Sequence, residues 1–282
     1  MAGWVYSSLP FFLLFRRCDI KKLKKVISCF AGLGCGELAL KRCGIETENM
    51  YAYEIDKYAE AVNRYHNPST FLGDITQWKS HTELIGGGVD LIMGGSPCQD
   101  VSVAGKRAGL SGARSSLVYV FAEMVKHYKP KYFFLENVAS MKKEDVEKIS
   151  NLMGVAPLKI SSANVSAQHR TRYYWTNIPY AYPQNNGELI RDILEKEPEN
   201  VLYYDSNRLT LKKVRDDLIV KNIGKIDNKR SQSYRVYDTE GKLPAIDTRG
   251  DRTKILMDNG NARSLSVTEI ERAFTIPDNY TL

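Results

Sequence analysis

Residues 26–36 of the chain read Val-Ile-Ser-Cys-Phe-Ala-Gly-Leu-Gly-Cys-Gly. The apolar start of this stretch predicts a buried strand, Val26–Phe30, and the residues after it predict the beginning of a helix. Glycines between the two let the backbone approach a ligand closely, and a helix N-terminus offers free N–H groups to that ligand. Such a loop on its own is more often a tight packing turn, so its meaning depends on the residues that follow.

Short apolar runs and helical patterns alternate from residue 25 to about residue 177. The predicted strands are Val26–Phe30, Met50–Tyr53, Val89–Met93, Tyr132–Leu135 and Tyr173–Trp175. The predicted helices between them are Glu37–Cys43, Tyr58–Tyr65 and Ser116–His127. This alternation predicts an α/β sheet with helices on both faces, whose functional residues lie beyond the carboxyl ends of the strands.

Two carboxylates follow the glycine loop in an order that favours an adenosine-type cofactor. Glu54 comes directly after the second predicted strand, where an acidic residue can hold ribose hydroxyls. Asp74, in Gly73-Asp74-Ile75, could accept a hydrogen bond from an adenine amine. No lysine–serine pair follows the glycines to bind a triphosphate.

Cys98 lies in Gly94-Gly95-Ser96-Pro97-Cys98-Gln99-Asp100, just past a predicted strand. A lone cysteine is usually a small buried hydrophobic residue, but a Gly-Gly-Ser-Pro turn buries little. Only the thiolate is a strong nucleophile, so a reactive cysteine needs positive or N–H-rich surroundings. Arg107 and Arg114 on the following loop, or Arg170 and Arg172 farther on, could supply the positive charge.

Two further groups of polar residues flank predicted strands. Glu136, in Glu136-Asn137-Val138, closes an apolar strand, where it is either a proton donor or a structural carboxylate. If residues 168–172 are a strand, Gln168, Arg170 and Arg172 share one face. The two guanidiniums would then suit phosphate or carbonyl oxygens, and His169 on the other face would be a packed side chain.

The charge of the chain favours an anionic partner. Its 282 residues carry a formal net charge of +7 and have an isoelectric point near 9.0. Most of that surplus lies in residues 208–235, which include Lys212, Lys213 and Arg215. This segment predicts contacts with a nucleic-acid backbone, and the alternative is a solvated basic surface.

The cysteines and the N-terminus predict an intracellular protein without a metal site. The five cysteines are odd in number and no close pair shows metal-ligand spacing, which disfavours both a disulfide framework and a zinc site. The apolar run Trp4–Phe15 is too short to cross a membrane and lacks the charge pattern of a signal peptide. We expect residues 1–24 to be an extension outside the fold.

These motifs, in this order, resemble the cytosine-5 DNA methyltransferase family. The matching blocks are Phe30–Gly36, Glu54, Asp74, Pro97-Cys98-Gln99, Gly112–Ser115, Glu136-Asn137-Val138, Gln168–Arg172, Leu189–Leu194, Arg263–Ser266 with Glu269 and Arg272, and Phe274–Pro277 with Tyr280. The stretch from Val165 to Tyr174 is also similar to the vertebrate de novo enzymes. The resemblance implies a Rossmann-like sheet that uses S-adenosyl-L-methionine, and it implies double-stranded DNA as partner.

The resemblance also implies roles for particular residues. Cys98 would attack carbon 6 of a flipped-out cytosine, Glu136 would act at ring nitrogen 3, and Arg172 with Arg170 would hold the carbonyl and phosphate. The cofactor would contact Phe30, Ala31, Gly32, Leu33, Gly34, Glu54, Ile55, Asp74, Ile75 and Pro97. The DNA would contact Gln99, Asn137, Gln168, Lys212, Lys213 and Arg215.

In the family arrangement, residues 25–179 are the catalytic domain, residues 180–240 the target-recognition domain and residues 241–282 a return to the catalytic domain. Family members normally continue past the block ending at Tyr280 into a Gly-Asn-containing motif that this sequence lacks. An inactive or split DNA-binding member therefore stays open as an alternative. An RNA cytosine-5 methyltransferase is a second alternative. The Cys-Phe-Thr tripeptide typical of the tRNA branch is absent. A cognate restriction endonuclease is a further expected partner.

Overall fold

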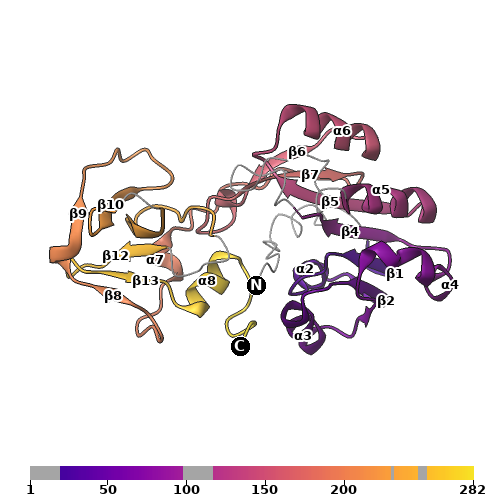
Figure 1. Cartoon of the computed structure of the whole chain (residues 1–282), viewed down its shortest axis with the longest axis horizontal. Coiled ribbons are helices and arrows are strands. Elements are labelled where there is room, and N and C mark those ends of the chain that lie inside the picture. Colours follow the sequence, from indigo (N-terminus) through magenta and orange to yellow (C-terminus); the bar gives the residue numbers. More distant parts are fainter. Residues whose placement is uncertain (1–19, 98–116, 230–231, 247–252) are drawn as a thin grey trace. The chain divides into compact units, whose positions relative to one another are not determined.

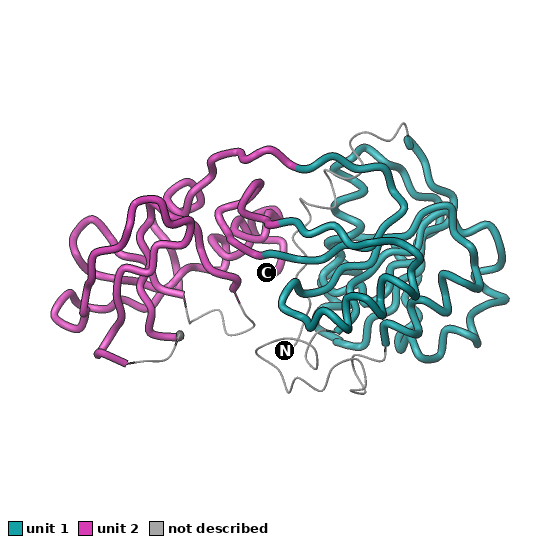
Figure 2. The backbone as a smooth tube through the Cα atoms, turned by 90° about the horizontal axis from the view of Figure 1, so that it is seen from above, with its two compact units in different colours: residues 1–160, 171–182 teal, residues 161–170, 183–282 magenta. Residues whose placement is uncertain are grey.

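The computed structural model describes residues 20–97, 117–229, 232–246 and 253–282. The chain divides into two compact units (Figure 2). Unit 1 comprises residues 1–160 and 171–182, and unit 2 comprises residues 161–170 and 183–282. Each unit contains its own β-sheet.

A seven-stranded sheet forms the centre of unit 1, with the strand order β3-β2-β1-β4-β5-β7-β6 (Figure 1). Its strands are β1 (Lys22–Cys29), β2 (Glu46–Tyr53), β3 (Thr70–Phe71), β4 (Leu91–Gly95), β5 (Tyr132–Val138), β6 (Leu158–Ser161) and β7 (Thr171–Thr176). Strands β3, β2, β1, β4 and β5 run parallel, and β7 runs antiparallel to β5. The carboxyl ends of β1, β2, β4 and β5 therefore share one edge with the beginning of β7.

Both faces of this sheet are covered. Neighbouring residues of β1 enter different hydrophobic clusters, since Ile27 packs with Phe121 of α5 and Val26 packs with Leu40 of α2. This alternation is the period-2 pattern of a strand that is buried on both sides. The helices are α2 (Cys35–Arg42), α3 (Lys57–His66), α4 (Thr82–Ile85), α5 (Leu117–Tyr128) and α6 (Lys143–Met153), with the 3-10 helix η1 (Ile75–His81). The predicted α/β architecture is confirmed.

The predicted elements of unit 1 correspond to observed ones, with shifted ends. The five predicted strands overlap β1, β2, β4, β5 and β7, and the three predicted helices overlap α2, α3 and α5. Helix α6 and strand β6 are not among the elements predicted from the sequence.

Unit 2 contains a six-stranded sheet in the order β8-β13-β12-β11-β10-β9. Its strands are β8 (Tyr203–Tyr204), β9 (Leu209–Leu211), β10 (Asn222–Ile226), β11 (Arg235–Tyr237), β12 (Lys254–Leu256) and β13 (Ala262–Ser264). Its helices are α7 (Ile190–Ile193) and α8 (Val267–Ala273), with the 3-10 helices η3 (Ser162–Asn164), η4 (Ser206–Arg208) and η5 (Gln232–Tyr234). Ile223, Ile226, Val236 and Ala262 form its small core.

The units differ from the predicted division of the chain. The boundary expected near residue 179 lies close to Pro183, where unit 2 resumes. The boundary expected near residue 240 lies inside the second sheet, because β12 pairs with β11 and β13 pairs with β8. Residues 161–170 belong to unit 2 because Leu243 donates its N–H to Ala167 O (2.7 Å) and accepts the N–H of His169 (2.8 Å).

A buried ion pair fixes the beginning of helix α8. The guanidinium of Arg263 donates two hydrogen bonds, both 2.7 Å long, to the carboxylate of Glu269. Glu269 also accepts the N–H of Ser266, and the Ser266 hydroxyl accepts the N–H of Glu269, which is a capping box. A bidentate pair of this kind positions both partners. Arg263, Ser266 and Glu269 of the family block are therefore structural residues within unit 2.

Two classes of feature are not found in the described part of the chain. None of its helices combines the length and the apolar character that a membrane crossing needs. Nor do histidine, cysteine, aspartate and glutamate side chains gather there in threes as a metal ion would require.

Candidate active site

The glycine loop follows β1 in a tightly constrained conformation. Phe30, directly after the strand, has a positive φ of 57°, which is unusual for a residue other than glycine. Gly34 has a φ of 84°, and a Cβ atom there would lie 2.5 Å from Asn67 Nδ2 and 2.6 Å from Asn63 Oδ1. Only glycine fits this position, because both the conformation and the space exclude a side chain. Sequence analysis missed Asn63 and Asn67, which lie against the loop.

Glu54 connects the end of β2 to this loop. One carboxylate oxygen accepts the N–H of Gly32 (2.7 Å), and the other accepts the N–H groups of Ile55 and Asp56, both at 2.8 Å. Because a carboxylate can accept about four hydrogen bonds, the oxygen bonded to Gly32 keeps capacity for a ligand hydroxyl. The structure thus brings together two of the predicted cofactor-binding residues, Gly32 and Glu54.

Other predicted cofactor residues differ in exposure. The side chain of Ile55 is 78% exposed, so it presents apolar surface next to Glu54. Asp74 is exposed and accepts the N–H of Thr76 (2.8 Å), which caps η1. The side chain of Ile75 is buried in the core of unit 1, so that residue could offer only its backbone to a ligand. Ala31 is buried, while Leu33 and Pro97 are partly buried.

The ends of β4 and β5 are joined through Asn137. Its side-chain nitrogen donates to the Ser96 hydroxyl (3.0 Å) and to Ser96 O (3.3 Å), and its oxygen accepts the N–H of Val138 (2.7 Å). Asn137 is buried, so its contacts favour a role in holding the Ser96-Pro97 turn rather than the predicted contact with DNA. Cys98 and Gln99, which follow this turn, lie outside the described residues.

Glu136 and Arg172 contact each other at the same edge of the sheet. Arg172 Nε lies 2.8 Å from Glu136 Oε1, and both side chains are largely buried. A further nitrogen of Arg172 donates to Thr171 O (2.8 Å), so the guanidinium is held from two sides. The antiparallel pairing of β7 with β5 produces this contact, because it places Arg172 opposite Val138. A carboxyl group and a guanidinium, both predicted to act on one base, are therefore adjacent.

The expectation that Gln168, Arg170 and Arg172 share one strand face is wrong. Strand β7 begins at Thr171, and Gln168 instead forms a bridge with Leu243 in unit 2. The Gln168 side chain is fully buried, and neither of its amide atoms has a hydrogen-bond partner among the described residues. The guanidinium of Arg170 lies over the ring of Phe274, 5.8 Å from its centre, also within unit 2.

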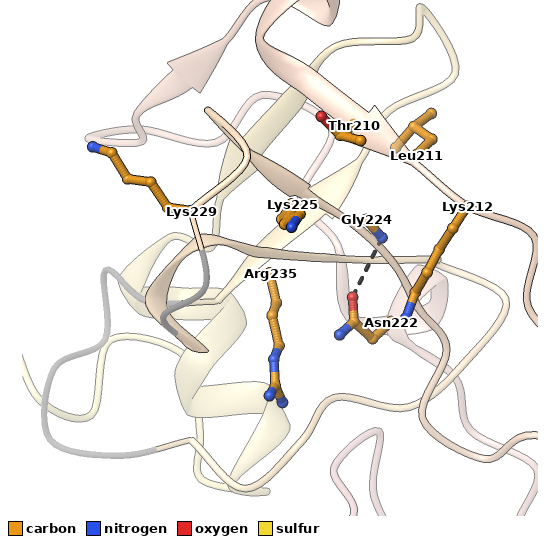
Figure 3. A pocket seen from close by; sticks show the side chains of 8 residues that line it. All are labelled: Thr210, Leu211, Lys212, Asn222, Gly224, Lys225, Lys229 and Arg235. Carbon is orange, nitrogen blue, oxygen red and sulfur yellow. Dashed lines mark hydrogen bonds between the residues drawn. The ribbon is translucent and has the colours of Figure 1, made fainter.

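A basic groove lies on the sheet of unit 2, with side chains contributed by β9, β10, β11 and adjoining residues (Figure 3). Its volume is about 340 Å³, and its lining residues are Thr210, Leu211, Lys212, Asn222, Gly224, Lys225, Lys229 and Arg235. Of the three basic residues among the predicted DNA contacts, Lys212 lines this groove. Lys213 is exposed, and Arg215 donates a hydrogen bond to Asp217 (2.9 Å) that lowers the pKa of that carboxyl group.

Known proteins resemble this chain in sequence. Residues 24–154 match the family model for C-5 cytosine-specific DNA methylases. The type II methyltransferase M.HhaI of Haemophilus parahaemolyticus is 28% identical over 91% of this chain and 85% of its own length. The orphan methyltransferase M.SPRI of Bacillus phage SPR is 26% identical over 86% of this chain and 69% of its own length. The orphan methyltransferase M.Rho11sI of Bacillus phage rho11s is 37% identical over 46% of this chain and 26% of its own length.

A solved structure supports the fold. The crystal structure of a putative DNA modification methyltransferase encoded within an E. coli prophage aligns with a TM-score of 0.59 at 18% identity. The alignment covers 91% of this chain and 90% of that one. Residues 24–154 therefore carry a C-5 cytosine-specific DNA methylase domain, the similarity to M.HhaI extends over most of both chains, and the solved structure supports the fold.

Proposed function

We propose that this protein is a DNA (cytosine-5)-methyltransferase, which transfers a methyl group from S-adenosylmethionine to carbon 5 of a cytosine in duplex DNA. The observation that carries the proposal is the contact of Glu136 with Arg172, because it brings an acid and a guanidinium to the sheet edge that also holds the glycine loop. The match to the family model supports the same class of reaction.

The residues at the glycine loop fit S-adenosylmethionine. The Glu54 carboxylate, oriented by three N–H groups, has remaining capacity to accept a ribose hydroxyl, and the exposed Ile55 gives the adenine an apolar surface. Gly34 packs against Asn63 and Asn67 with no room for a side chain, which fixes the conformation of the loop. Phe30, Ala31, Leu33, Asp74, Ile75 and Pro97 would complete the cofactor contacts. When bound, the cofactor supplies an electrophilic methyl group on a positively charged sulfur.

The chain's own residues would activate the cytosine. The Cys98 thiolate forms a bond to carbon 6, and the ring electrons move toward nitrogen 3, where Glu136 donates a proton or hydrogen bond. Carbon 5 would thereby become nucleophilic and bond to the methyl group, while the bond between that methyl and the cofactor sulfur breaks and its electrons stay on sulfur. Loss of the carbon-5 proton then restores the double bond and expels Cys98. Because these ring atoms are stacked inside a duplex, the base must first be flipped out.

Arg172 and Asn137 would position the reacting groups. Arg172 contacts Glu136 and can direct its remaining N–H groups at the cytosine carbonyl, which fixes the acid and the base relative to each other. Asn137 holds Ser96 two residues before Cys98, so it would orient the turn that carries the nucleophile. Arg170 and Gln99 remain proposed DNA contacts, whereas the complete burial of Gln168 does not favour its predicted contact with DNA.

The DNA backbone would bind in the basic groove of unit 2. Lys212, Lys225, Lys229 and Arg235 line it together with no acidic residue, although Lys229 also lies 3.9 Å from Asp227 Oδ2 outside the lining. Arg215 is a poorer candidate than the sequence suggests, because Asp217 partly neutralises it. Basic residues from three neighbouring strands thus form one cationic surface. Adjacent basic residues such as Lys212-Lys213 do not form this surface by themselves.

We expect Lys212→Gln with Lys225→Gln to make the salt dependence of DNA binding shallower. Each phosphate contact contributes about 0.9 to the slope of log K against log salt concentration on duplex DNA, because bound counterions are released. Titrating a labelled duplex at several salt concentrations measures this slope. The matched control is Lys213→Gln with Arg215→Gln, which removes the same charge outside the groove lining and should leave the slope closer to that of the wild type. Equal changes in both variants would show that the groove is only a solvated basic surface.

Transfer of labelled methyl groups tests the proposed reaction. The wild-type chain is incubated with labelled S-adenosylmethionine and either duplex DNA or RNA. Label in DNA that reports as 5-methylcytosine on sequencing supports the proposal. Label only in RNA would favour an RNA methyltransferase, and DNA binding without label would favour a non-catalytic family member.

The relatives also bear on the biological partner. Some are named type II methyltransferases, which favours a cognate restriction endonuclease, while two phage relatives are named orphan methyltransferases. We propose that this chain modifies sites which such an endonuclease would otherwise cleave. Protection of methylated DNA from restriction enzymes that cleave cytosine-containing sites identifies the sequence concerned.

A further inference from the structure

Glu37 is a buried acid that the proposed reaction does not use. It lies in the first turn of α2, directly after the glycine loop, and its residue is 3% exposed. Neither of its carboxyl oxygens has a hydrogen-bond partner among the described residues. Burial raises the pKa of this carboxyl group above its ordinary value, which favours the neutral form. A buried polar group without a partner is costly, so it calls for a functional explanation.

The groups that face Glu37 come from three elements. The backbone N–H of Glu37 itself, Ser28 of β1 and Asn63 of α3 lie close enough to offset part of the effect of burial on its pKa, although none meets hydrogen-bonding geometry. Lys41, one turn along α2, is the charged group that acts on it. The Lys41 ammonium donates to His66 O (2.8 Å) and forms no ion pair with Glu37 within the described residues. Glu37 therefore faces hydrogen-bonding groups rather than a counter-ion.

Asn63 connects this carboxyl group to the glycine loop. The Asn63 side chain is fully buried, donates a long hydrogen bond to Gly32 O (3.4 Å) and accepts one from Asn67 Nδ2 (2.8 Å). The N–H of the same glycine donates to Glu54 (2.7 Å). The N–H of Gly32 is thus bonded to Glu54, and the carbonyl oxygen of Gly32 is bonded to Asn63. At 3.4 Å, the hydrogen bond from Asn63 to Gly32 O is long and therefore weak.

We propose that Glu37 is a positioning residue that locks the glycine loop, through Asn63, when the cofactor binds. The neutral carboxyl group accepts the second Nδ2 hydrogen of Asn63 and donates its own proton to the Ser28 hydroxyl. Asn63 is then fixed against Gly32, and Gly32 against Glu54. The proposal rests on the proposed function, because it assumes that S-adenosylmethionine binds at this loop.

Substitutions of Glu37 separate hydrogen bonding from packing. Glu37→Leu keeps the approximate volume but cannot form hydrogen bonds, so we expect its Kd for S-adenosylmethionine to rise at least tenfold. At saturating cofactor kcat should stay within about twofold, because Glu37 touches no reacting atom. Glu37→Gln retains a donor and an acceptor, so its Kd should stay within about twofold of the wild-type value. Asp145→Leu, which replaces another buried acid of unit 1, controls for a general loss of stability.

A double-mutant cycle tests whether Glu37 acts through Asn63. In an Asn63→Ala background, Glu37→Leu should change the Kd less than twofold, because its partner is already absent. If Glu37→Leu does not fold, the pH dependence of cofactor binding by the wild type and Glu37→Gln provides the test instead. Burial raises the pKa of Glu37, so raising the pH through that pKa ionises the carboxyl group and removes its proton donor. The wild type should lose affinity across this range, and Glu37→Gln should not.

Calorimetric titration gives the decisive comparison. Equal cofactor affinity of wild type and Glu37→Leu, or independent effects of Glu37→Leu and Asn63→Ala, would overturn the role of Glu37. A wild-type chain that binds no S-adenosylmethionine would instead count against the proposed function. We expect Glu37→Leu to bind S-adenosylmethionine tenfold more weakly and Glu37→Gln to bind it as the wild type does. In the Asn63→Ala background, Glu37→Leu should have no such effect.

Discussion

Cys98→Ala should abolish methyl transfer while leaving DNA binding largely intact. Without the thiolate, nothing adds to carbon 6 of cytosine, and carbon 5 remains a poor nucleophile. The substitution removes one sulfur atom and leaves the basic groove of unit 2 and the Glu54–Gly32 contact unchanged. Incorporation of labelled methyl groups measures turnover, and titration of a labelled duplex measures binding. The expected loss of turnover is complete within detection.

A trapped adduct provides independent evidence for the same nucleophile. Duplex DNA carrying 5-fluorocytosine should form a covalent complex with the wild type, because the fluorine cannot leave as a proton does and the bond to Cys98 persists. A denaturing gel separates this complex from free protein. Cys98→Ala should form none, whereas Cys43→Ala, which removes a partly buried thiol of α2's C-terminal end, should behave as the wild type. A wild-type protein that methylates DNA without forming the adduct would exclude the covalent mechanism.

Glu136→Gln should lower the rate of methyl transfer by about 10²–10⁴-fold, the usual worth of a positioned proton donor. Glutamine has almost the shape of glutamate, and its amide oxygen can still accept the hydrogen bond from Arg172 Nε. The fold at the end of β5 should therefore persist, while the proton for ring nitrogen 3 is lost. Single-turnover measurements at saturating DNA and cofactor give the chemical rate.

Cofactor affinity distinguishes this effect from a distorted site. Glu136 is in β5, and the contacts of Glu54 with the glycine loop do not involve it, so Kd for S-adenosylmethionine should change little. Asp145→Asn alters a buried acid of α6 that has no proposed role in the reaction and should keep the wild-type rate. Near-normal turnover by Glu136→Gln would remove Glu136 from the mechanism.

The predictable part of the molecule is the part with strong local signals. Apolar runs such as Val26–Phe30 and Tyr132–Leu135 indicate strands because a sheet covered on both faces needs apolar residues at successive positions. The order of these strands along the chain then predicts which polar residues meet. Glu54 reaches the glycine loop because β1 and β2 are parallel neighbours. This relation follows from the α/β pattern alone.

Other features depend on contacts between distant segments, which local patterns do not encode. The alternation from Gln168 to Arg172 suggested one strand, but the backbone around Gln168 pairs with Leu243, more than seventy residues later. Asn63 is a polar residue within the predicted helix Tyr58–Tyr65, and Asn67 follows that helix, so neither is marked as buried by a local pattern. Their burial is evident only once the glycine loop is packed on them. The strands of unit 2 have two to five residues, too few for a reliable period.

The strand order of unit 2 has a consequence for synthesis of the chain on the ribosome. Strand β8 has β13 as its neighbour, since Tyr203 pairs with Arg263 and Tyr204 with Ala262. Translation reaches Tyr182, the last residue of unit 1, well before it reaches Arg263. Domains generally begin to fold as they emerge from the ribosome, so unit 1 can fold before β13, the strand that pairs with β8, has been synthesised. During that interval unit 2 exposes unpaired strand edges, which are sites of aggregation. Slow translation between the two units would prolong this interval, and binding of a chaperone to residues 183–261 would protect the growing chain.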